Sequence, residues 1–392
     1  MKILLLCWRD THHPQGGGSE RYLERVGDFL VSQGHEVLFH TAMYPGAPRR
    51  SMQRGVAYTR AGGKMTVYPL AWLRLVAARL GFGRFRDVDV VVDTQNGIPF
   101  FAGPLSGKPT VLLTHHCHRE QWPVAGPVLS RVGWFLERWV APWLYRKAPY
   151  VTVSLPSATE LMQLGVDANR IEIIRNGVDP LPDTTSENSL LRRDDGRVHL
   201  VTLSRLVPHK QIEHAMDVLA AVSATHDVVL DVIGSGWWDE QLRDYAAELG
   251  VSDRVEFHGQ VSEGMKHALL ARATLHVMPS RKEGWGLAVI EAAQHAVPTV
   301  GYRSSAGLQD SIIDDHTGIL VSDKAELIRA TTLLLDDPAY RTRLGTAAQE
   351  RAREFSWHTT GMQFEQLLAS LSESPRETHQ RHSEPQHREE HA

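Results

Sequence analysis

The sequence predicts an α/β protein built on parallel β-sheets. Short aliphatic runs recur along the chain, and longer stretches with apolar residues at helical spacing separate them. Strands that alternate with helices are typical of βαβ units, in which consecutive strands lie parallel. The length of 392 residues fits two or three domains of roughly 150 residues each.

The first half of the chain carries six predicted strands. They cover residues 3–7, 36–41, 88–92, 110–114, 150–154 and 171–174. The clearest helix follows the first of these strands. It begins near Ser19, and Tyr22, Val26 and Phe29 place apolar side chains on one face. Gly34 is expected to end this helix before the second strand.

The second half repeats this pattern. Its predicted strands cover residues 199–204, 228–233, 255–258, 275–278, 298–301 and 319–321. Two Rossmann-like units therefore follow one another along the chain. Residues 179–197 between them are rich in Pro, Asp, Ser, Thr and Asn, so we interpret this stretch as a linker and expect the hinge there.

The resulting plan has domains at residues 1–178 and 198–354, joined by the linker 179–197. Residues 355–371 are expected to form a helix that can return to the first domain. Residues 372–392 contain no aliphatic residue before Ala392, which predicts a disordered tail. Four histidines in that tail leave metal binding as the alternative interpretation.

Charge and composition exclude several classes of protein. Lys and Arg number 42 and Asp and Glu number 46, so the formal net charge of −4 gives no global positive field for nucleic acid. The two cysteines cannot form a disulfide framework, which fits a reducing compartment. Arg74 and Arg79 interrupt the most apolar stretch, so no spanning helix is expected. The first apolar run, near Ile3, is too short for a signal peptide. We therefore expect a cytoplasmic protein.

A glycine-rich segment, Gly16-Gly17-Gly18-Ser19-Glu20, falls between the first strand and the first helix. Ligands bind at this carboxyl edge of a parallel sheet, where glycines and the free N–H groups of a helix start admit a phosphate. The spacing is not GxGxxG and lacks the Gly-Lys-Ser/Thr of a P-loop, which argues against NAD binding and ATP hydrolysis. A flexible turn explains this segment alone equally well.

Two cations follow the opening strand of the second half. Arg205 and Lys210 lie on one predicted loop, a pattern that suits a diphosphate, because Arg offers a planar fork and Lys a point charge. Two solvated surface cations are the alternative. Gly234 ends the next strand and would permit the backbone to approach the same ligand.

The strongest element is the run from Ser280 to Glu291. Glu283 and Glu291 bracket a Gly-Trp-Gly turn and a short apolar segment. This spacing places one carboxylate at a helix entrance and the other two turns along the helix. Carboxylates accept hydrogen bonds from vicinal hydroxyls, so the pair favours a sugar or a ribose as ligand. A solvated helix face is the alternative interpretation.

With these motifs in this order, the chain resembles the retaining nucleotide-sugar glycosyltransferases of the large family 4 group, also called glycosyl transferases group 1. The matching segments are Gly17-Gly18-Ser19-Glu20, Asn176-Gly177-Val178-Asp179, Arg205 with Lys210, the Glu283 and Glu291 pair, and Ser305-Ala306-Gly307-Leu308. The likeness covers about residues 1 to 365. It implies the GT-B fold, in which two Rossmann-like domains with parallel sheets face a central cleft.

The resemblance also implies a role for each matching residue. Arg205 and Lys210 would neutralise the leaving diphosphate, and Glu283 would contact hydroxyls of the transferred sugar. Glu291 would hold the ribose hydroxyls. The implied donor-binding set is Gly17, Gly18, Arg205, Lys210, Gly234, Glu283, Gly284, Trp285, Gly286, Leu287 and Glu291.

His115 matches the histidine that the family places near the reacting carbon, so we count it with Arg205, Lys210 and Glu283 as catalytic. His116 follows where many relatives carry Asp, so which of the two imidazoles faces the substrate stays open. Zinc binding by residues 115–118 is a weaker interpretation, because adjacent side chains on an extended segment point apart. His116, Arg119 and Trp122 are the acceptor candidates.

The resemblance implies transfer of a sugar, a hexose in particular, from a nucleoside diphosphate donor to an acceptor hydroxyl of a glycolipid or envelope glycan. No DxD-type motif stands at a suitable loop, so we expect no metal and no other cofactor. One departure is Gly307-Leu308-Gln309-Asp310, where relatives often have Gly-Leu-Pro-Glu. The alternatives are an inverting or epimerising enzyme with His115 or His116 as base, and a non-catalytic sugar-nucleotide scaffold.

Two further segments bear on partners. Residues 70–86 mix apolar side chains with Arg74, Arg79, Arg84 and Arg86, as a helix on an anionic membrane surface does. Packing against the first sheet is the alternative. A second cluster has near-helical spacing and is interpreted as core; it comprises Trp134, Phe135, Trp139, Trp143 and Tyr145.

Overall fold

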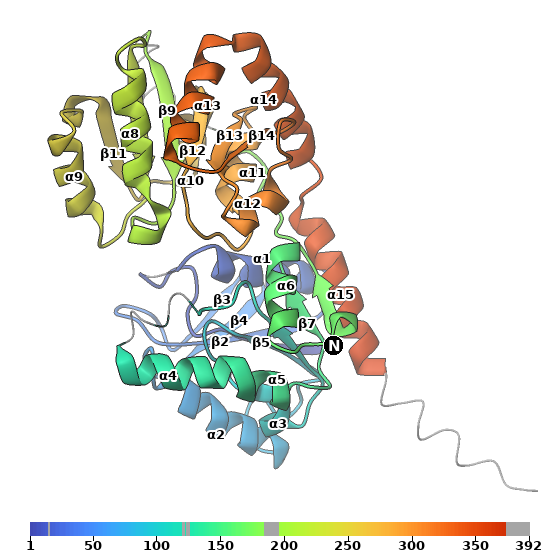
Figure 1. Cartoon of the computed structure of the whole chain (residues 1–392). Helices are drawn as coiled ribbons and strands as arrows, with labels where there is room; N and C mark the ends of the chain where they lie inside the picture. Colours follow the sequence, from blue (N-terminus) through green and yellow to red (C-terminus); the bar gives the residue numbers. More distant parts are fainter. Residues whose placement is uncertain (15, 120–121, 123–125, 184–195, 374–392) are drawn as a thin grey trace, which may run out of the picture. The chain divides into compact units, whose positions relative to one another are not determined.

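The computed structural model describes residues 1–14, 16–119, 122, 126–183 and 196–373. The chain forms two compact units, coloured mainly blue to green and yellow to red in Figure 1. Unit 1 contains residues 1–152, 158–174 and the segment from residue 357 onward, and unit 2 contains residues 153–157 and 175–356. Each unit has its own sheet.

The sheet of unit 1 has eight strands in the order β3-β4-β2-β1-β5-β6-β7-β8. These are β1 (Lys2–Leu6), β2 (Glu36–Thr41), β3 (Arg50–Gln53), β4 (Val56–Arg60), β5 (Val90–Thr94), β6 (Thr110–Leu113), β7 (Tyr150–Thr152) and β8 (Ile171–Ile173). All neighbours pair in parallel except the edge strand β3, which is antiparallel to β4. The strand order reverses direction between β1 and β5.

Helices cover both faces of this sheet. They are α1 (Gly18–Ser32), α2 (Val67–Arg79), α3 (Ala102–Ser106), α4 (Pro127–Phe135), the π-helical turn η2 (Leu136–Val140), α5 (Ala141–Leu144), α6 (Leu155–Gln163), the short η3 (Ala168–Arg170) and α15 (Trp357–Glu373). Gly27 of α1 lies against Leu5 and Val37, whereas α2 packs on the opposite face with Leu4 and Leu6. Alternation along β1 therefore gives each face its own apolar layer.

Unit 2 has a six-stranded parallel sheet in the order β11-β10-β9-β12-β13-β14. Its strands are β9 (Val198–Leu203), β10 (Val228–Ile233), β11 (Val255–Gly259), β12 (Leu275–Met278), β13 (Thr299–Tyr302) and β14 (Gly318–Val321). This is the Rossmann order, and its switch point lies between β9 and β12. Loops that leave the carboxyl ends of these two strands are therefore the expected place for a ligand.

The helices of unit 2 follow the strands in regular alternation. They are η4 (Pro208–Lys210), α8 (Ile212–Val222), α9 (Asp239–Glu248), η5 (Ser252–Arg254), α10 (Glu263–Arg272), α11 (Leu287–Ala293), α12 (Ala306–Ser311), α13 (Lys324–Asp336) and α14 (Pro338–Ala352). Leu219 of α8 and Leu334 of α13 pack on one sheet face with Leu230, and Leu269 of α10 packs on the other with Val201.

Two parallel-sheet α/β units confirm the predicted fold class, and every predicted strand is present within a few residues. The prediction missed β3 and β4. These strands form a hairpin through Arg54 and Gly55, both with positive φ, and β3 is polar and half exposed. A short edge strand of that kind has no aliphatic run to reveal it.

The last helix belongs to the first unit. Trp357 and Phe364 of α15 meet Tyr22 of α1 with ring centroids 6.0 and 6.2 Å apart. His35 and Glu365 add a hydrogen bond at 2.8 Å between Nε2 and Oε1. Helix α15 continues to Glu373, two residues beyond the predicted end, so residues 372 and 373 are helical rather than part of a tail. The predicted tail from residue 374 and the linker residues 184–195 lie outside the described residues.

The prediction that the second aromatic cluster is core is wrong for three of its members. Phe135, Trp139 and Trp143 are 56%, 61% and 63% exposed, whereas Tyr145 is buried. The helical segment from α4 to α5 buries its other face, which carries Gly133, Glu137 and Ala141. Helical spacing of aromatic residues therefore did reveal one common face, but that face points to solvent.

Helix α2 packs on the first sheet, as the alternative interpretation of residues 70–86 stated, and it also leaves apolar side chains exposed. Tyr68, Ala71 and Leu75 pack on the sheet, while Leu73 and Leu80 are exposed. Three arginines of residues 70–86 also have partners in the fold: Arg74 lies 3.3 Å from His40, Arg79 donates to the Pro104 carbonyl, and Arg86 pairs with Asp87. In the described part of the chain, no helix combines the length and apolar character that crossing a bilayer requires.

Candidate active site

The switch point of unit 2 brings two predicted segments together. The loop after β9 carries Arg205 and Lys210, and the loop after β12 carries residues 279–286. The backbone N–H of Arg281 donates to the carbonyl of His209 at 2.9 Å, which ties the loops to each other. Parallel neighbouring strands end at the same edge, so residues more than seventy positions apart in the sequence meet here.

Lys210 and Glu283 form the centre of this site. The Lys210 Nζ lies 2.5 Å from the Glu283 Oε1, and both side chains are largely buried. Arg205 is exposed on the same loop. Burial and the charge of Lys210 lower the pKa of His209 to about 4, so this imidazole is neutral at pH 7. The site therefore presents cations beside a carboxylate at the sheet edge.

The Gly284-Trp285-Gly286 turn sets the entrance of α11. Gly286 has φ +90° and caps the helix in the left-handed region, which favours glycine. Trp285 is buried, and its ring meets Phe355 edge to face at 4.8 Å, so its side chain anchors the loop. The Gly284 carbonyl accepts a hydrogen bond from Ser154 Oγ at 2.7 Å. The turn is therefore held from two sides.

Glu291 lies one turn into α11, behind that entrance and with its own cation. Lys266 of α10 places its Nζ 2.6 Å from the Glu291 Oε1 and 2.8 Å from the Glu263 Oε2. Burial lowers the pKa of Lys266, but the two carboxylates outweigh this effect and raise it. Sequence reasoning missed Lys266. The sequence around it gives no signal, because the same helix also carries Glu263, His267 and Arg272.

Gly234 and Gly307 are needed by the fold of this edge. A Cβ on Gly234, which has φ +132°, would lie 1.9 Å from the carbonyl oxygen of Ser204. A Cβ on Gly307 would lie 2.4 Å from the carbonyl oxygen of Glu283. Close backbone approach therefore explains both glycines, and it packs their loops directly against those that carry Lys210 and Glu283.

Asp310, which departs from the family's Gly-Leu-Pro-Glu pattern, contacts two arginines. Arg175 donates to both carboxylate oxygens of Asp310, at 3.0 and 2.9 Å, and Arg351 donates to the Asp310 carbonyl at 2.8 Å. The first contact is a bidentate fork and raises the pKa of Arg175. Asp310 therefore fixes the segment that leads to Asn176 and Gly177.

In unit 1, the glycine segment and His115 lie together at the start of α1. Gly17 is the N-cap, and its N–H donates to Glu20 Oε2 at 2.8 Å; Gly18 begins the helix. Glu20 is fully buried and pairs with Arg9 at 2.7 Å. Glu20 thus holds the loop in shape, a positioning role that its place in the sequence motif did not reveal.

His115 is buried beside this helix start. Its ring meets Tyr22 edge to face at 5.2 Å, and burial lowers its pKa to about 4. His116 is half-buried, with its ring centroid 4.6 Å from that of His118. The two neighbouring imidazoles thus have different surroundings, and His115 is the one that packs against the helix start and stays neutral at pH 7.

The acceptor candidates Arg119 and Trp122 pack against the α4 to α5 segment. Trp122 Nε1 donates to the buried carboxylate of Glu137 at 2.6 Å, and its ring lies where Gly97 and Gly133 leave space. The Arg119 guanidinium lies 5.7 Å from the ring centroid of Trp134. Trp122 is thereby fixed in place, whereas Arg119 is exposed.

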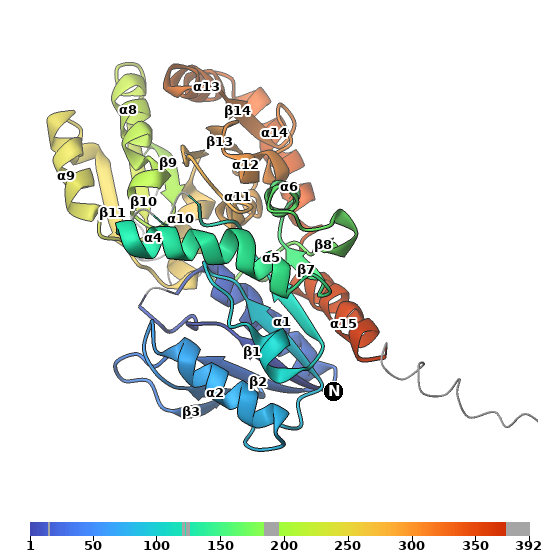
Figure 2. The same cartoon turned by 60° about the horizontal axis from the view of Figure 1, so that its bottom comes forward.

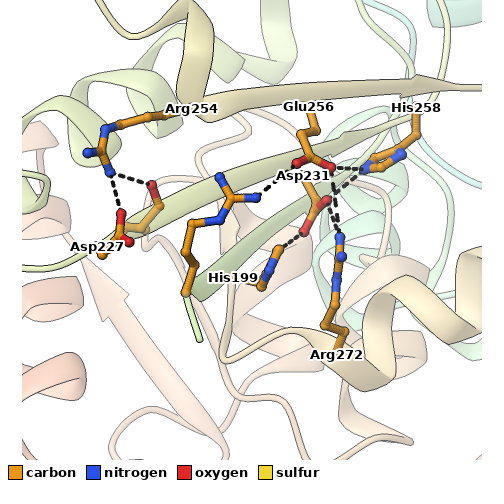
Figure 3. A network of polar contacts seen from close by, with 9 residues as sticks. His199, Asp227, Asp231, Arg254, Glu256, His258 and Arg272 are labelled. Carbon is orange, nitrogen blue, oxygen red and sulfur yellow. Dashed lines mark hydrogen bonds and ion pairs between the residues drawn. The ribbon is translucent and has the colours of Figure 1, made fainter. Parts of the chain in front are cut away.

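A polar cluster also lies on the far strands of unit 2. Among the described residues, Asp231, Glu256 and His258 form the one group whose ligand atoms are close enough for a metal ion. Figure 3 shows the Arg272 guanidinium reaching toward both carboxylates, 2.9 Å from Asp231 and 4.0 Å from Glu256. Arg272 already supplies the positive charge, so these residues do not fit a metal.

Comparison with known proteins agrees with this arrangement. The family model described as Glycosyltransferase Family 4 matches residues 16–180, and the one described as Glycosyl transferases group 1 matches residues 184–351. The chain is 27% identical over 384 residues to the GDP-mannose-dependent alpha-(1-6)-phosphatidylinositol monomannoside mannosyltransferase of Mycolicibacterium smegmatis, covering 92% of this chain and 97% of that protein.

Solved structures show the same fold. Sucrose-phosphate synthase from Thermosynechococcus elongatus matches 95% of this chain and 99% of its own, with a TM-score of 0.79 and 21% identity. Anabaena HepE in complex with UDP and glucose matches 94% of this chain and 100% of its own, with a TM-score of 0.74 and 20% identity.

Fold and site together define a nucleotide-sugar glycosyltransferase with two Rossmann-like units. The chain belongs to the GT-B glycosyltransferases of group 1, because two adjoining family models match nearly its whole described length and GT-B structures share its fold. The predictions of family, fold and enzyme class are thus confirmed.

Proposed function

We propose that this enzyme transfers a hexose from a nucleoside diphosphate donor to a hydroxyl of a lipid-linked or envelope glycan, with retention of the anomeric configuration. The contact between Lys210 and Glu283 at the switch point of unit 2 carries this proposal. It places a point charge suited to a phosphate next to a carboxylate suited to sugar hydroxyls. The relative named for phosphatidylinositol monomannoside supports a lipid-linked acceptor.

In the proposed reaction, the bond between the sugar C1 and the diphosphate oxygen breaks as the acceptor oxygen bonds to C1 on the same face. The acceptor proton passes to the departing phosphate oxygen, so no carboxylate nucleophile is needed. Lys210 and Arg205 stabilise the growing charge on the diphosphate. Glu283 orients the sugar, and Glu291, held by Lys266, accepts from the ribose hydroxyls.

For unit 1 we propose the roles that the family resemblance implies. Gly17 and Gly18 at the start of α1 face the diphosphate and, lacking side chains, let it approach the backbone, and the neutral imidazole of His115 hydrogen-bonds the donor sugar. His116, Arg119 and Trp122 contribute to acceptor binding. No metal takes part, because side-chain cations meet the leaving-group charge.

We further propose a cytoplasmic enzyme that attaches to anionic lipid through the arginines of residues 70–86. Leu73 and Leu80 are exposed beside them. Each cation near such a surface contributes about 1 kcal/mol. Replacing Arg74, Arg79, Arg84 and Arg86 together should weaken co-sedimentation with anionic vesicles at low salt. Equal binding of the variant would remove this helix from the proposal.

A donor screen tests the function most directly. Thermal shifts with GDP-, UDP- and ADP-hexoses should identify one stabilising donor, and the mannosyltransferase relative makes GDP-mannose the first choice. Turnover of that donor separates an enzyme from a binding scaffold. NMR of the product should show the donor's anomeric configuration, whereas the opposite configuration would favour the inverting alternative with a histidine base.

A further inference from the structure

We propose that the helical segment from α4 to α5 inserts aromatic side chains into the surface of an anionic phospholipid bilayer. We call its exposed face the aromatic ridge, defined by Val128, Val132, Phe135, Trp139 and Trp143. Figure 2 shows the segment as one long, nearly straight helical rod on unit 1. This surface is distinct from the arginines of residues 70–86, and its test does not depend on the sugar-transfer reaction.

The geometry of the ridge comes from its spacing. Successive members are three or four residues apart, which places them on one face of a helix. All five are exposed, and Trp139 and Trp143 each keep more than 60% of their surface in solvent. Folded proteins usually bury large apolar side chains in their core. A row of exposed apolar side chains on one helix face therefore marks an interaction site.

The charges beside the ridge identify the partner. Residues 126–148 contain Arg131, Arg138, Arg146 and Lys147 but a single acid, Glu137. Glu137 is fully buried, where it accepts hydrogen bonds from the His118 N–H and Trp122. The exposed face of this segment therefore carries apolar side chains, and the charged side chains beside them are all positive. That combination complements an anionic membrane surface, which attracts cations and takes up apolar side chains.

Two cations lie next to the ridge tryptophans. The guanidinium of Arg138 is 4.7 Å from the ring centroid of Trp139, and that of Arg146 is 5.8 Å from that of Trp143. Tryptophan favours the interface between lipid and water, and a neighbouring arginine can reach the phosphate groups there. The same charges disfavour a second copy of the chain, because a two-fold contact through this face would bring its four cations against four identical ones.

Vesicle binding by the full chain tests the ridge. The variant Trp139→Ser/Trp143→Ser should bind vesicles of phosphatidylglycerol and phosphatidylcholine at least tenfold more weakly than the wild type. Trp237→Ser is the matched control, because Trp237 is an exposed tryptophan of unit 2, and it should bind like the wild type. Both variants replace exposed side chains, and an unchanged thermal midpoint would establish that the fold is intact.

Two further measurements distinguish insertion into the lipid from attraction by charge alone and from self-association. Brominated lipids should quench the tryptophan fluorescence of the wild type more than that of the double variant, and part of this quenching should persist at high salt. Equal binding of the double variant, or no binding by the wild type, would overturn the proposal. A wild-type dimer in sedimentation that the double variant converts to a monomer would assign the ridge to self-association instead.

Discussion

The Nζ of Lys266 lies 2.6 Å from the Oε1 of Glu291, and both side chains are largely buried in unit 2. Glu263 shares the same ammonium from a more exposed position. Lys266 therefore fixes the orientation of the Glu291 carboxylate before any ligand arrives. A carboxylate prepared in this way loses little freedom when it accepts hydrogen bonds from ribose hydroxyls.

Glu291→Ala should weaken binding of the nucleoside diphosphate by about tenfold, a change of about 1.4 kcal/mol, since the ribose contacts act in the ground state as well. Isothermal titration calorimetry measures this loss. Glu263→Ala removes the exposed carboxylate from the same lysine and should bind nucleotide almost as the wild type does. Equal affinity of Glu291→Ala and the wild type would contradict the ribose assignment.

Lys210→Ala should lower kcat by about 10²-fold or more, because negative charge grows on the diphosphate as the glycosidic bond breaks. Initial-rate measurements with the donor identified by thermal shift give this value. Lys324→Ala removes an exposed lysine of the same unit, paired with Asp217, and should leave kcat unchanged. If both variants turn over at the wild-type rate, Lys210 has no part in the mechanism.

Activity should survive an excess of EDTA, because the proposed leaving-group charge is met by Lys210 and Arg205. Initial rates before and after chelation, in buffers treated to remove metals, measure this. A loss of activity that magnesium or manganese restores would show that a divalent ion carries this charge instead.

The sequence predicted the sheets well because parallel strands buried on both faces are nearly continuous aliphatic runs. The run Val228–Ile233 is an example, and it matches β10 without a shift. The hairpin of β3 and β4 was not predicted, because the edge strand β3 is polar and β4 has only two aliphatic residues, Val56 and Ala57. The ridge tryptophans were misplaced for a related reason: periodicity identifies a common face, but whether that face meets protein or solvent depends on its neighbours.

The motifs of the candidate site could be predicted from the sequence, but not which of their side chains contact one another. Topology brings Lys210 beside Glu283, and the motif order alone indicated that both face one ligand. The partners that hold the site in place come from distant segments. Lys266 supports Glu291 across two helices, and Arg175 fixes Asp310 from a segment 135 residues away. No local pattern in a single sequence reports such contacts.

Arg272→Ala should destabilise unit 2 by about 3 kcal/mol. Burial alone would raise the pKa of Asp231, but hydrogen bonds from His199 and His258 and the charge of Arg272 lower it to about 2. The variant leaves this buried carboxylate short of a cation, which is costly. Arg254→Ala breaks the exposed pair with Asp227 in Figure 3 and should cost about 1 kcal/mol or less. Urea unfolding measures the free energy of unfolding of both variants. Equal losses of stability would contradict the idea that the burial of Asp231 makes its cation costly to remove.

His276 should make the protein less stable as the pH falls from 7 to 5. It is fully buried in β12, its Nδ1 is 3.0 Å from Thr299 Oγ1, and burial lowers its pKa from 6.5 to about 3. The unfolded chain therefore binds a proton on this residue between about pH 6.5 and 3 while the folded chain does not. The stability that neutral His276 contributes is fully present above pH 6.5 and is lost as the pH falls through that range. At pH 5 the loss amounts to about 2 kcal/mol.

The slope of unfolding free energy against pH isolates this effect from any general loss of stability. His276→Asn should unfold more easily at every pH, yet its free energy of unfolding should fall less between pH 7 and 5 than that of the wild type. His316→Asn replaces an exposed histidine and should keep the wild-type slope. Some pH dependence will remain in His276→Asn, since burial also lowers the pKa of His40 to about 3. Parallel curves for the wild type and His276→Asn would mean that His276 takes up no proton on unfolding.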